Sequence, residues 1–206
     1  MHVHGCVLMT SKLQRRGPGS RAGGNHPTRL ELLNAATHLA SAEGLDALTV
    51  SAITNAAGHA KGTFYVHFDD RSQMIAELHR RFHDDLFSSI EARTAAMVPG
   101  SERAHIRIEA FLDGCRSQPP VRAMLLEARS LPEIASLVEQ RNAQAAQALK
   151  ADLQGRVAHC SETARLIVGA TIEVALQELT ANRRLPRLRA ALYSFLPAAK
   201  TPGMMK

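Results

Sequence analysis

The sequence predicts an all-α protein, in which a small N-terminal domain of three helices precedes a larger helical domain, with about nine helices in total. One observation is periodicity. Apolar residues recur at the three- and four-residue spacing of helices, and the chain beyond residue 75 lacks the alternation typical of strands. The other observation is punctuation, because pairs such as Pro99-Gly100 and Pro119-Pro120 separate the periodic stretches and end one helix before the next begins.

The first elements predicted are a helix over residues 29–44 and, within residues 48–74, two short helices around a tight turn. The hydroxyl of Thr49 can accept a backbone N–H at the start of the first short helix. Gly58 follows the last apolar residue of that helix, where glycine readily adopts the left-handed backbone of a helix end. Residues 60–67 then form the second short helix.

Two aromatic residues and two acids mark the end of this second short helix. Phe64 and Phe68 are four residues apart, so they lie on one side of the helix and are expected in the core. Asp69 or Asp70 is expected to cap the following helix, where a carboxylate accepts an unpaired N–H and is favoured by the helix dipole. Two short helices held at a fixed angle are suited to placing one of them in a DNA groove.

This segment resembles the DNA-binding domain of the TetR family of bacterial transcriptional regulators. The resemblance covers residues 29–75, with residues 29–44 similar to the family's first helix, and the rest of the chain is similar only in length and helical character. Its most specific part is the run Ala57-Gly58-x-x-Lys61-Gly62-Thr63-Phe64-Tyr65-x-His67-Phe68, followed by Arg71 and Met74-Ile75.

The resemblance implies a DNA-binding surface on the two short helices. The residues it implies are Thr49, Ser51, Lys61, Gly62, Thr63, Tyr65, His67 and Arg71. Lys61 could reach a phosphate or a guanine edge, and Gly62 lets the backbone approach DNA closely. Tyr65 and His67 match positions that hydrogen-bond phosphates, and Arg71 matches one that grips a phosphate at the start of the next helix.

Two positions depart from the family pattern. His59 stands where an apolar residue packs the turn, which leaves open whether the ring is packed or reaches solvent and DNA. Ala60 stands where a hydroxyl residue often caps the recognition helix, and loss of such a cap costs about 1 kcal/mol.

The remaining chain predicts further helices, and their approximate spans are 69–97, 101–117, 120–129, 133–153, 161–182 and 185–196. We therefore expect four segments along the chain. These are a flexible basic arm over 1–27, the helix-turn-helix domain over 28–74, a ligand-binding and dimerisation domain over 75–197, and a C-terminal tail over 198–206.

In the family, the last two helices of each subunit form a four-helix dimer interface. The resemblance therefore implies a homodimer, with interface candidates Leu166, Ala170, Val174, Leu188 and Leu192. A two-fold dimer also suits DNA binding, because two recognition helices must be spaced about one DNA turn apart, roughly 34–36 Å or a multiple of it. The operator would then be palindromic double-stranded DNA.

The middle helices would surround a pocket for a small-molecule effector of unknown class. Candidate lining residues are His105, Phe111, Met124, Leu125 and Glu173. The implied mechanism is a repressor that leaves its operator when the effector binds, because ligand and DNA prefer different arrangements of the dimer.

Other regulators with this scaffold remain open as alternatives, among them an activator and a constitutive DNA-binding protein without an effector. A metal-responsive regulator is suggested by His79 and His83, four residues apart on one helix, with Asp84 next to them. His159 and Cys160 could add ligands to such a site.

An enzyme is the least favoured alternative. The sequence has no glycine-rich phosphate loop, Gly-x-Ser-x-Gly elbow or His-Glu-x-x-His motif, so we expect no catalytic residues, no resident metal and no cofactor.

Charge and composition agree with a nucleic-acid partner. The net charge is +6, and the chain before Glu31 holds five basic residues and no acidic one. A basic arm beside a DNA-binding domain can add salt-sensitive affinity. No apolar run is long enough for a signal peptide or a membrane span, and three scattered cysteines suggest no disulfide framework, so a cytoplasmic protein without a membrane partner is expected.

Overall fold

The computed structural model describes residues 26–117 and 132–198, and every regular element in these ranges is a helix, so the all-α prediction is confirmed. The elements are α1 (Pro27–Glu43), the 3-10 helix η2 (Leu45–Ala47), α2 (Val50–Ala56), α3 (Lys61–His67), α4 (Arg71–Thr94), α5 (Ser101–Ser117), α7 (Pro132–Leu153), α8 (Cys160–Ala181) and α9 (Pro186–Tyr193). The helix expected over 120–129 and nearly all of the basic arm lie outside the described residues.

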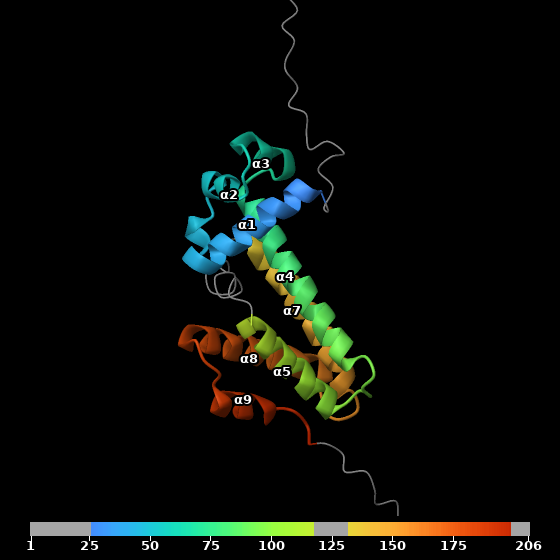
Figure 1. Ribbon diagram of the computed structural model, residues 1–206. Helices are drawn as coiled ribbons and strands as arrows, with labels where there is room; N and C mark the ends of the chain where they lie inside the picture. Colours follow the sequence, from blue (N-terminus) through green and yellow to red (C-terminus); the bar gives the residue numbers. More distant parts are fainter. Residues whose placement is uncertain (1–25, 118–131, 199–206) are drawn as a thin grey trace, which may run out of the picture.

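The N-terminal domain is formed by α1, α2, α3 and the first turns of α4, at one end of the molecule (Figure 1). Its core is apolar and closely packed: Leu32 of α1, Ile53 of α2, Phe64 of α3 and Met74 of α4 are all fully buried. Phe68 is also buried beside Phe64, with ring centroids 5.4 Å apart, as the four-residue spacing predicted. This shared core holds the two short helices at a fixed angle.

Local capping sets the limits of the short helices. The Thr49 hydroxyl accepts the backbone N–H of Ala52 at 3.1 Å, and the Asp70 carboxylate accepts that of Gln73 at 2.8 Å. Gly58 has a φ of 71°, which a residue with a Cβ rarely adopts. The caps at Thr49 and Asp70 and the left-handed turn at Gly58 were all predicted and are confirmed. Ala60 precedes α3 without a side-chain cap.

The larger domain is built around α4, which runs out of the N-terminal domain with α7 alongside it (Figure 1). The long helices α5 and α8 pack against each other, α5 also packs on α4, and α8 also packs on α7. Their shared core contains Leu86, Leu112, Leu149 and Ile167. Because α4 contributes side chains to both cores, a displacement of this helix would change the packing in both domains.

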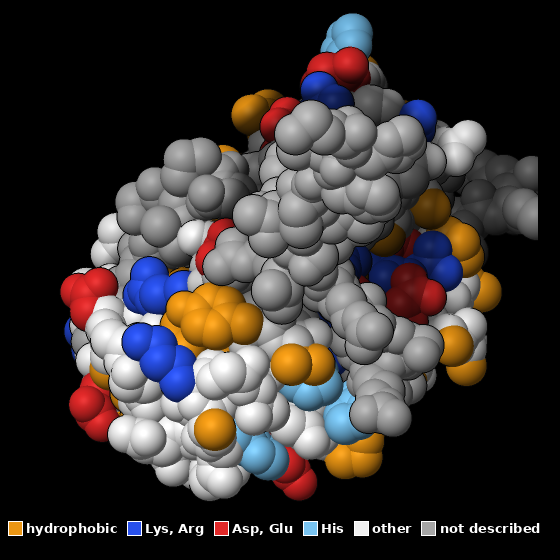
Figure 2. Space-filling model, turned by 90° about the horizontal axis from the view of Figure 1, so that it is seen from above, with side chains coloured by type: hydrophobic (Ala, Val, Ile, Leu, Met, Phe, Trp, Pro, Cys, Tyr) orange, Lys and Arg blue, Asp and Glu red, His pale blue; other side chains and the backbone are white. Residues whose placement is uncertain are grey.

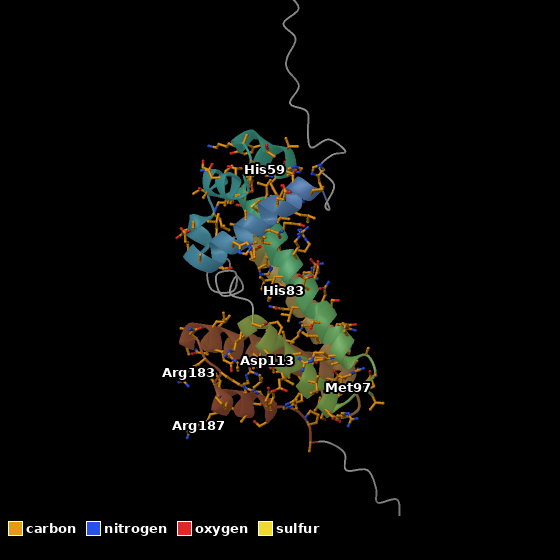
Figure 3. The ribbon with its side chains drawn as sticks, in the orientation of Figure 1. His59, His83, Met97, Asp113, Arg183 and Arg187 are labelled. Atoms are coloured by element: carbon orange, nitrogen blue, oxygen red, sulfur yellow. The ribbon has the colours of Figure 1, made fainter. Side chains whose placement is uncertain are left out.

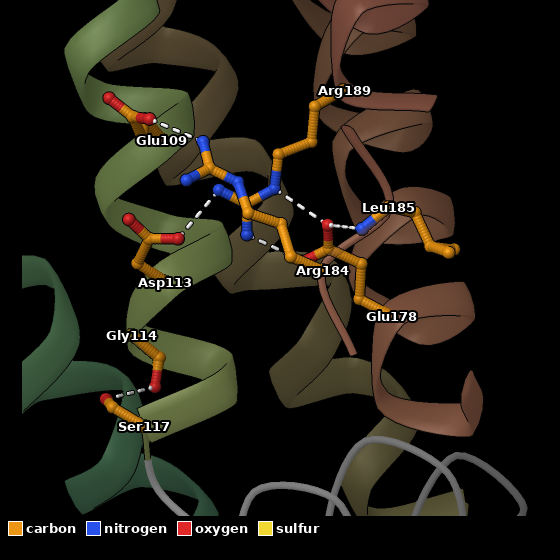
Figure 4. Close-up of polar contacts among 8 residues, drawn as sticks. All are labelled: Glu109, Asp113, Gly114, Ser117, Glu178, Arg184, Leu185 and Arg189. Carbon is orange, nitrogen blue, oxygen red and sulfur yellow. Dashed lines mark hydrogen bonds and ion pairs between the residues drawn. The ribbon is translucent and has the colours of Figure 1, made fainter. Parts of the chain in front are cut away.

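A buried charge network fixes α9 against α8 and α5 (Figure 4). The guanidinium of Arg189, 1% exposed, donates to both carboxylate oxygens of the fully buried Glu178, at 2.7 and 2.6 Å. It also donates to Asp113 of α5 at 2.7 Å, while Glu178 accepts the backbone N–H of Leu185 at 2.8 Å. Burial alone would raise the pKa of Glu178, but the bonds from Arg189 and Leu185 outweigh it, and the pKa lies below its usual value.

Within residues 26–117 and 132–198, no helix combines the length and the apolar character needed to cross a bilayer.

Candidate functional site

The outward face of α3 carries the predicted recognition residues. Lys61 and Gly62 are exposed, Tyr65 is 54% exposed, and Thr63 is partly buried. Phe64 of the same helix is fully buried, so packing of this side chain in the domain core leaves the exposed side chains directed away from the protein. Figure 2 shows the molecule from this end, where Lys or Arg side chains lie beside hydrophobic ones.

The supporting helix α2 adds hydroxyl groups beside α3. Thr49 and Ser51 are both exposed. The Thr49 oxygen accepts the capping bond from Ala52, which leaves its proton available for donation. The exposed polar groups of α2 and α3 therefore include an ammonium, hydroxyls and a phenol, all of which can donate to phosphates or base edges.

Arg71 has a structural role at the start of α4. Its Nε donates to the carbonyl of Leu48 at 2.9 Å, and another guanidinium nitrogen donates to the carbonyl of Leu45. These bonds tie the entrance of α2 to α4. The phosphate contact expected from Arg71 stays a prediction.

The phosphate contact expected from His67 is wrong for this conformation. The His67 side chain is only 7% exposed, with its ring 5.0 Å from that of His26, because the end of α3 turns inward under the start of α1. Burial lowers its pKa, and His26 and Arg29 add to the effect. His67 is therefore part of the domain core.

Two polar contacts that brace the motif from α1 were not predicted. Arg29 donates to the His67 carbonyl at 2.6 Å, and its guanidinium lies 4.1 Å from the ring centre of Phe68. His59, in the turn between α2 and α3, lies 2.7 Å from Glu31 of α1. The sequence left open whether the His59 ring is packed in the turn or is directed to solvent and DNA. In the structure the ring is directed to α1, where it contacts Glu31.

A second candidate site is a cavity of about 70 Å³ between α4, α5, α7 and α8. Its walls are mainly apolar, and each of the four helices contributes at least one polar side chain. The lining residues are His83, Phe87, Ile90, Arg107, Ile108, Phe111, Arg141, Asn142, Ala145, Ala148, Leu149, Val168, Thr171 and Ile172. Figure 3 shows His83 on α4, between the N-terminal domain and the lower helices.

Of the predicted pocket residues, Phe111 lines this cavity. His105 does not line it; its ring packs against that of Tyr193 of α9 in a tilted arrangement, with centroids 3.9 Å apart. Glu173 faces outward on α8 and accepts a bond from Gln177 at 2.8 Å. Met124 and Leu125 lie outside the described residues.

His83 and its neighbour His79 are buried without hydrogen bonds to their ring nitrogens in the described part of the chain. They are 5% and 1% exposed, and their ring centroids are 4.5 Å apart. Burial, with a smaller effect from nearby Arg141, lowers the pKa of His79 to about 4. Burial, with His79 and Arg141 next, lowers the pKa of His83 to about 3, so both rings are neutral near pH 7.

The two histidines are also the strongest metal candidates from the sequence. Among residues 26–117 and 132–198, however, no His, Cys, Asp or Glu completes a group of three around them. Asp84, the nearest acid in sequence, is directed to Arg141 at 2.5 Å.

The expected dimer residues divide into two sets. Leu166 of α8 is 75% exposed and Leu188 of α9 is 36% exposed, while Ala170 is partly buried. Val174 and Leu192 are 4% and 2% exposed, so their assignment to an interface is wrong: both pack inside the protomer. The exposed leucines, Leu166 and Leu188, remain candidates for contact with a partner subunit.

The two short helices, their turn and the exposed residues of α3 together define a helix-turn-helix DNA-binding protein. Residues 32–78 match the family described as bacterial regulatory proteins, tetR family. These residues therefore form a DNA-binding domain of the kind found in this family.

Known proteins extend the likeness beyond the motif. The chain is 43% identical over 70 residues to the HTH-type transcriptional repressor KstR2 of Rhodococcus jostii (strain RHA1), and the similar stretch spans 34% of this chain and 34% of that repressor. A transcriptional regulator from Rhodococcus sp. Rha1 is similar in structure, with a TM-score of 0.68 and 21% identity, over 81% of this chain and 92% of that one. The regulator FadR of Bacillus subtilis, in complex with stearoyl-CoA, gives a TM-score of 0.67 and 16% identity, over 81% and 94%.

Proposed function

We propose that this protein is a homodimeric transcriptional repressor that binds a palindromic operator and leaves it when a small molecule binds. The observation that carries the proposal is the outward face of α3, where Lys61 and Tyr65 are exposed while Phe64 of the same helix is fully buried in the domain core. A repressor acting on chromosomal DNA would work in the cytoplasm.

The DNA-binding step follows from the chemistry of the exposed groups. Lys61 lies at the first residue of α3, where its ammonium can meet a phosphate or the acceptors of guanine. A Cβ built on Gly62 meets nothing within 4 Å, so the space beside it is open to a close approach of DNA. Tyr65, one turn further along, can donate its phenol to a phosphate.

The switching step is supported by the course of α4. Met74 and Ile75 of this helix are buried in the N-terminal core, and His83, Phe87 and Ile90 line the cavity. Ile75 and His83 are about 12 Å apart along the helix axis, at roughly 1.5 Å per residue. A ligand that displaces α4 at the cavity would therefore move the recognition helix, and Bacillus subtilis FadR shows that a protein of this fold can be found with a small-molecule ligand.

The test begins with selection of DNA fragments from a random pool by the full-length protein, followed by binding assays on the selected site. We expect inverted half-sites separated by about one helical turn or a multiple of it. Lys61→Ala and Tyr65→Ala should each weaken binding by about fivefold to a hundredfold, as loss of one phosphate or base contact does.

Arg93→Ala is the matched control, because Arg93 is exposed near the far end of α4. It should bind DNA as the wild type does, and all three variants should keep the wild-type melting temperature. Wild-type affinity in both Lys61→Ala and Tyr65→Ala would show that α3 does not read DNA.

A further inference from the structure

The end of the cavity nearest the N-terminal domain holds buried donors that no described residue satisfies. Both ring nitrogens of His83 and the Nε of Arg141 lack a hydrogen-bond partner in residues 26–117 and 132–198. His83 is 5% exposed, and both side chains line the same cavity. Buried polar groups in native proteins are almost always bonded, so a cluster of unpaired ones points to a partner that arrives from outside the chain.

The charged residues that line the cavity indicate the sign of the charge that this partner carries. None of the lining residues that the structure describes is acidic, whereas Arg107 and Arg141 are both among them. Arg107 lies 3.3 Å from the buried Asp152, but Arg103 shares the same carboxylate at 2.5 Å, so two guanidiniums depend on one buried acid. The nearest further acid is the exposed Glu91, 3.6 Å from Arg107. Arg141 pairs with Asp84, whose side chain is 55% exposed and stabilises the charge less than a buried acid would.

The remaining lining residues indicate the polarity of the rest of the ligand. Apart from His83, Arg107, Arg141, Asn142 and Thr171, all the lining residues are apolar, and Phe87, Phe111 and Leu149 are among them. The apolar side chains offer no hydrogen bonds, and the stretch of α4 from His83 to Ile90 that lines the cavity covers about two turns, or roughly 11 Å. A ligand that fills this part of the cavity must be apolar there.

We infer that the cavity binds an organic carboxylate with an apolar body, whose carboxylate accepts hydrogen bonds from Arg141 Nε and His83 and whose body lies along Phe87, Phe111 and Leu149. This inference rests on the proposed function in one respect, because it gives the chemical class of the effector. The guanidinium supplies a charge-assisted bond, and the neutral imidazole supplies a second donor without adding a buried charge.

Cavity size links this ligand to the switch. The volume of about 70 Å³ is small beside the roughly 300–1,000 Å³ of ordinary ligand pockets. Such a ligand therefore holds α4 and α7 further apart than they are here. The expansion occurs where α4 continues into the DNA-binding domain.

The experiment measures direct binding of octanoate and octanol to the full-length protein by calorimetry, without DNA. The two probes share the same chain and differ in the charged head. Octanoate should bind about tenfold or more tightly than octanol, because both head groups can accept a hydrogen bond from Arg141 but only the carboxylate adds a charge opposite to that of the guanidinium. Arg141→Met and His83→Phe should each weaken octanoate by roughly tenfold and octanol by much less, which also shows that the apolar wall is intact.

Arg93→Met is the control for general loss of positive charge, and it should bind both probes as the wild type does. Equal affinity for the two probes, no binding of octanoate, or wild-type octanoate affinity in both pocket variants would each overturn the inference. Operator release is measured separately. If octanoate binds as expected but leaves the protein on its operator, the carboxylate site stands and the proposed induction by this ligand class fails.

Discussion

His79 and His83 are held neutral at the centre of the fold by burial, and this places a pH dependence in the stability of the protein. In the unfolded chain both rings titrate near the ordinary value of 6.5, whereas in the fold the pKa values fall to about 4 and about 3. The pKa is lowered on folding, so the contribution to stability is fully present above pH 6.5. It is lost as the pH falls from 6.5 toward the folded values, because only the unfolded chain takes up the protons.

We predict that the free energy of unfolding falls by about 2 kcal/mol for each of these histidines between roughly pH 6.5 and pH 5. His79→Leu, which removes one titrating ring at similar volume, should reduce this loss by about half. Chemical denaturation at a series of pH values measures the effect.

Phe82→Leu serves as the control, because Phe82 lies in the same core between the two histidines and does not titrate. It should lower stability by a similar amount at every pH. A pH profile of His79→Leu that runs parallel to the wild type would show that His79 carries no such linkage.

At the scale of the element, substitutions of Gly58 and Gly62 should distinguish an effect on stability from an effect on DNA binding within the same motif. Gly58 has a φ of 71°, and Gly62 lies in α3 without a positive φ, while a Cβ meets nothing within 4 Å at either position. Gly58→Ala should therefore cost about 1 kcal/mol of stability through backbone strain alone. Gly62→Ala should keep or slightly raise stability, since alanine favours a helix by up to about 1 kcal/mol over glycine. Thermal and chemical denaturation measure both.

The two variants should rank in the opposite order when operator affinity is measured instead of stability. The methyl group of Gly62→Ala would occupy the open space in which we propose that the backbone of α3 approaches DNA, so operator affinity should drop although the protein is at least as stable. Gly58→Ala should bind close to normally under conditions in which it is folded. Equal operator affinity for Gly62→Ala and the wild type would mean that α3 does not approach DNA at this residue.

The motif was predictable because its determinants are local in sequence. A cap at Thr49, a left-handed glycine at Gly58 and a cap at Asp70 depend on neighbours within a turn, and the structure confirms all three. The face of a long helix that meets the core is not local. Val174 and Leu166 belong to the same helix and are both apolar, yet packing against α7 and α5 buries the first and leaves the second exposed.

The cavity was predicted poorly for the same reason. Phe111 was identified, but Arg107 and Arg141 were not, because a cation in a helical sequence is most often on a solvated face. A weak signal was available: His79, His83 and Phe87 recur every four residues on α4, which places two imidazoles on an otherwise apolar face. Arg141 is likewise the one cation in the alanine-rich run over 135–148.

At the scale of the whole molecule, the proposed recognition of a palindromic operator requires two protomers, and we propose that the exposed apolar residues of α8 and α9 form the surface at which they pair. Leu166 is 75% exposed, which is unusual for a leucine in the middle of a long helix, and Leu188 of the neighbouring helix is 36% exposed. In a two-fold dimer each such residue occurs twice in one interface, so a charge placed there is repeated across the axis.

We predict that Leu166→Asp is a monomer at micromolar concentration. Its operator affinity should fall sharply, while its helix content should remain close to that of the wild type. The protomer should still fold, because the new carboxylate is solvated there, whereas in the dimer it would be desolvated near its copy. Sedimentation velocity gives the mass, and circular dichroism gives the helix content. Val98→Asp is the matched control, since Val98 is 83% exposed in the turn between α4 and α5, and it should remain dimeric. A dimeric Leu166→Asp protein would place the interface elsewhere, and dissociation of both variants would show that added negative charge alone, wherever it lies, separates the protomers.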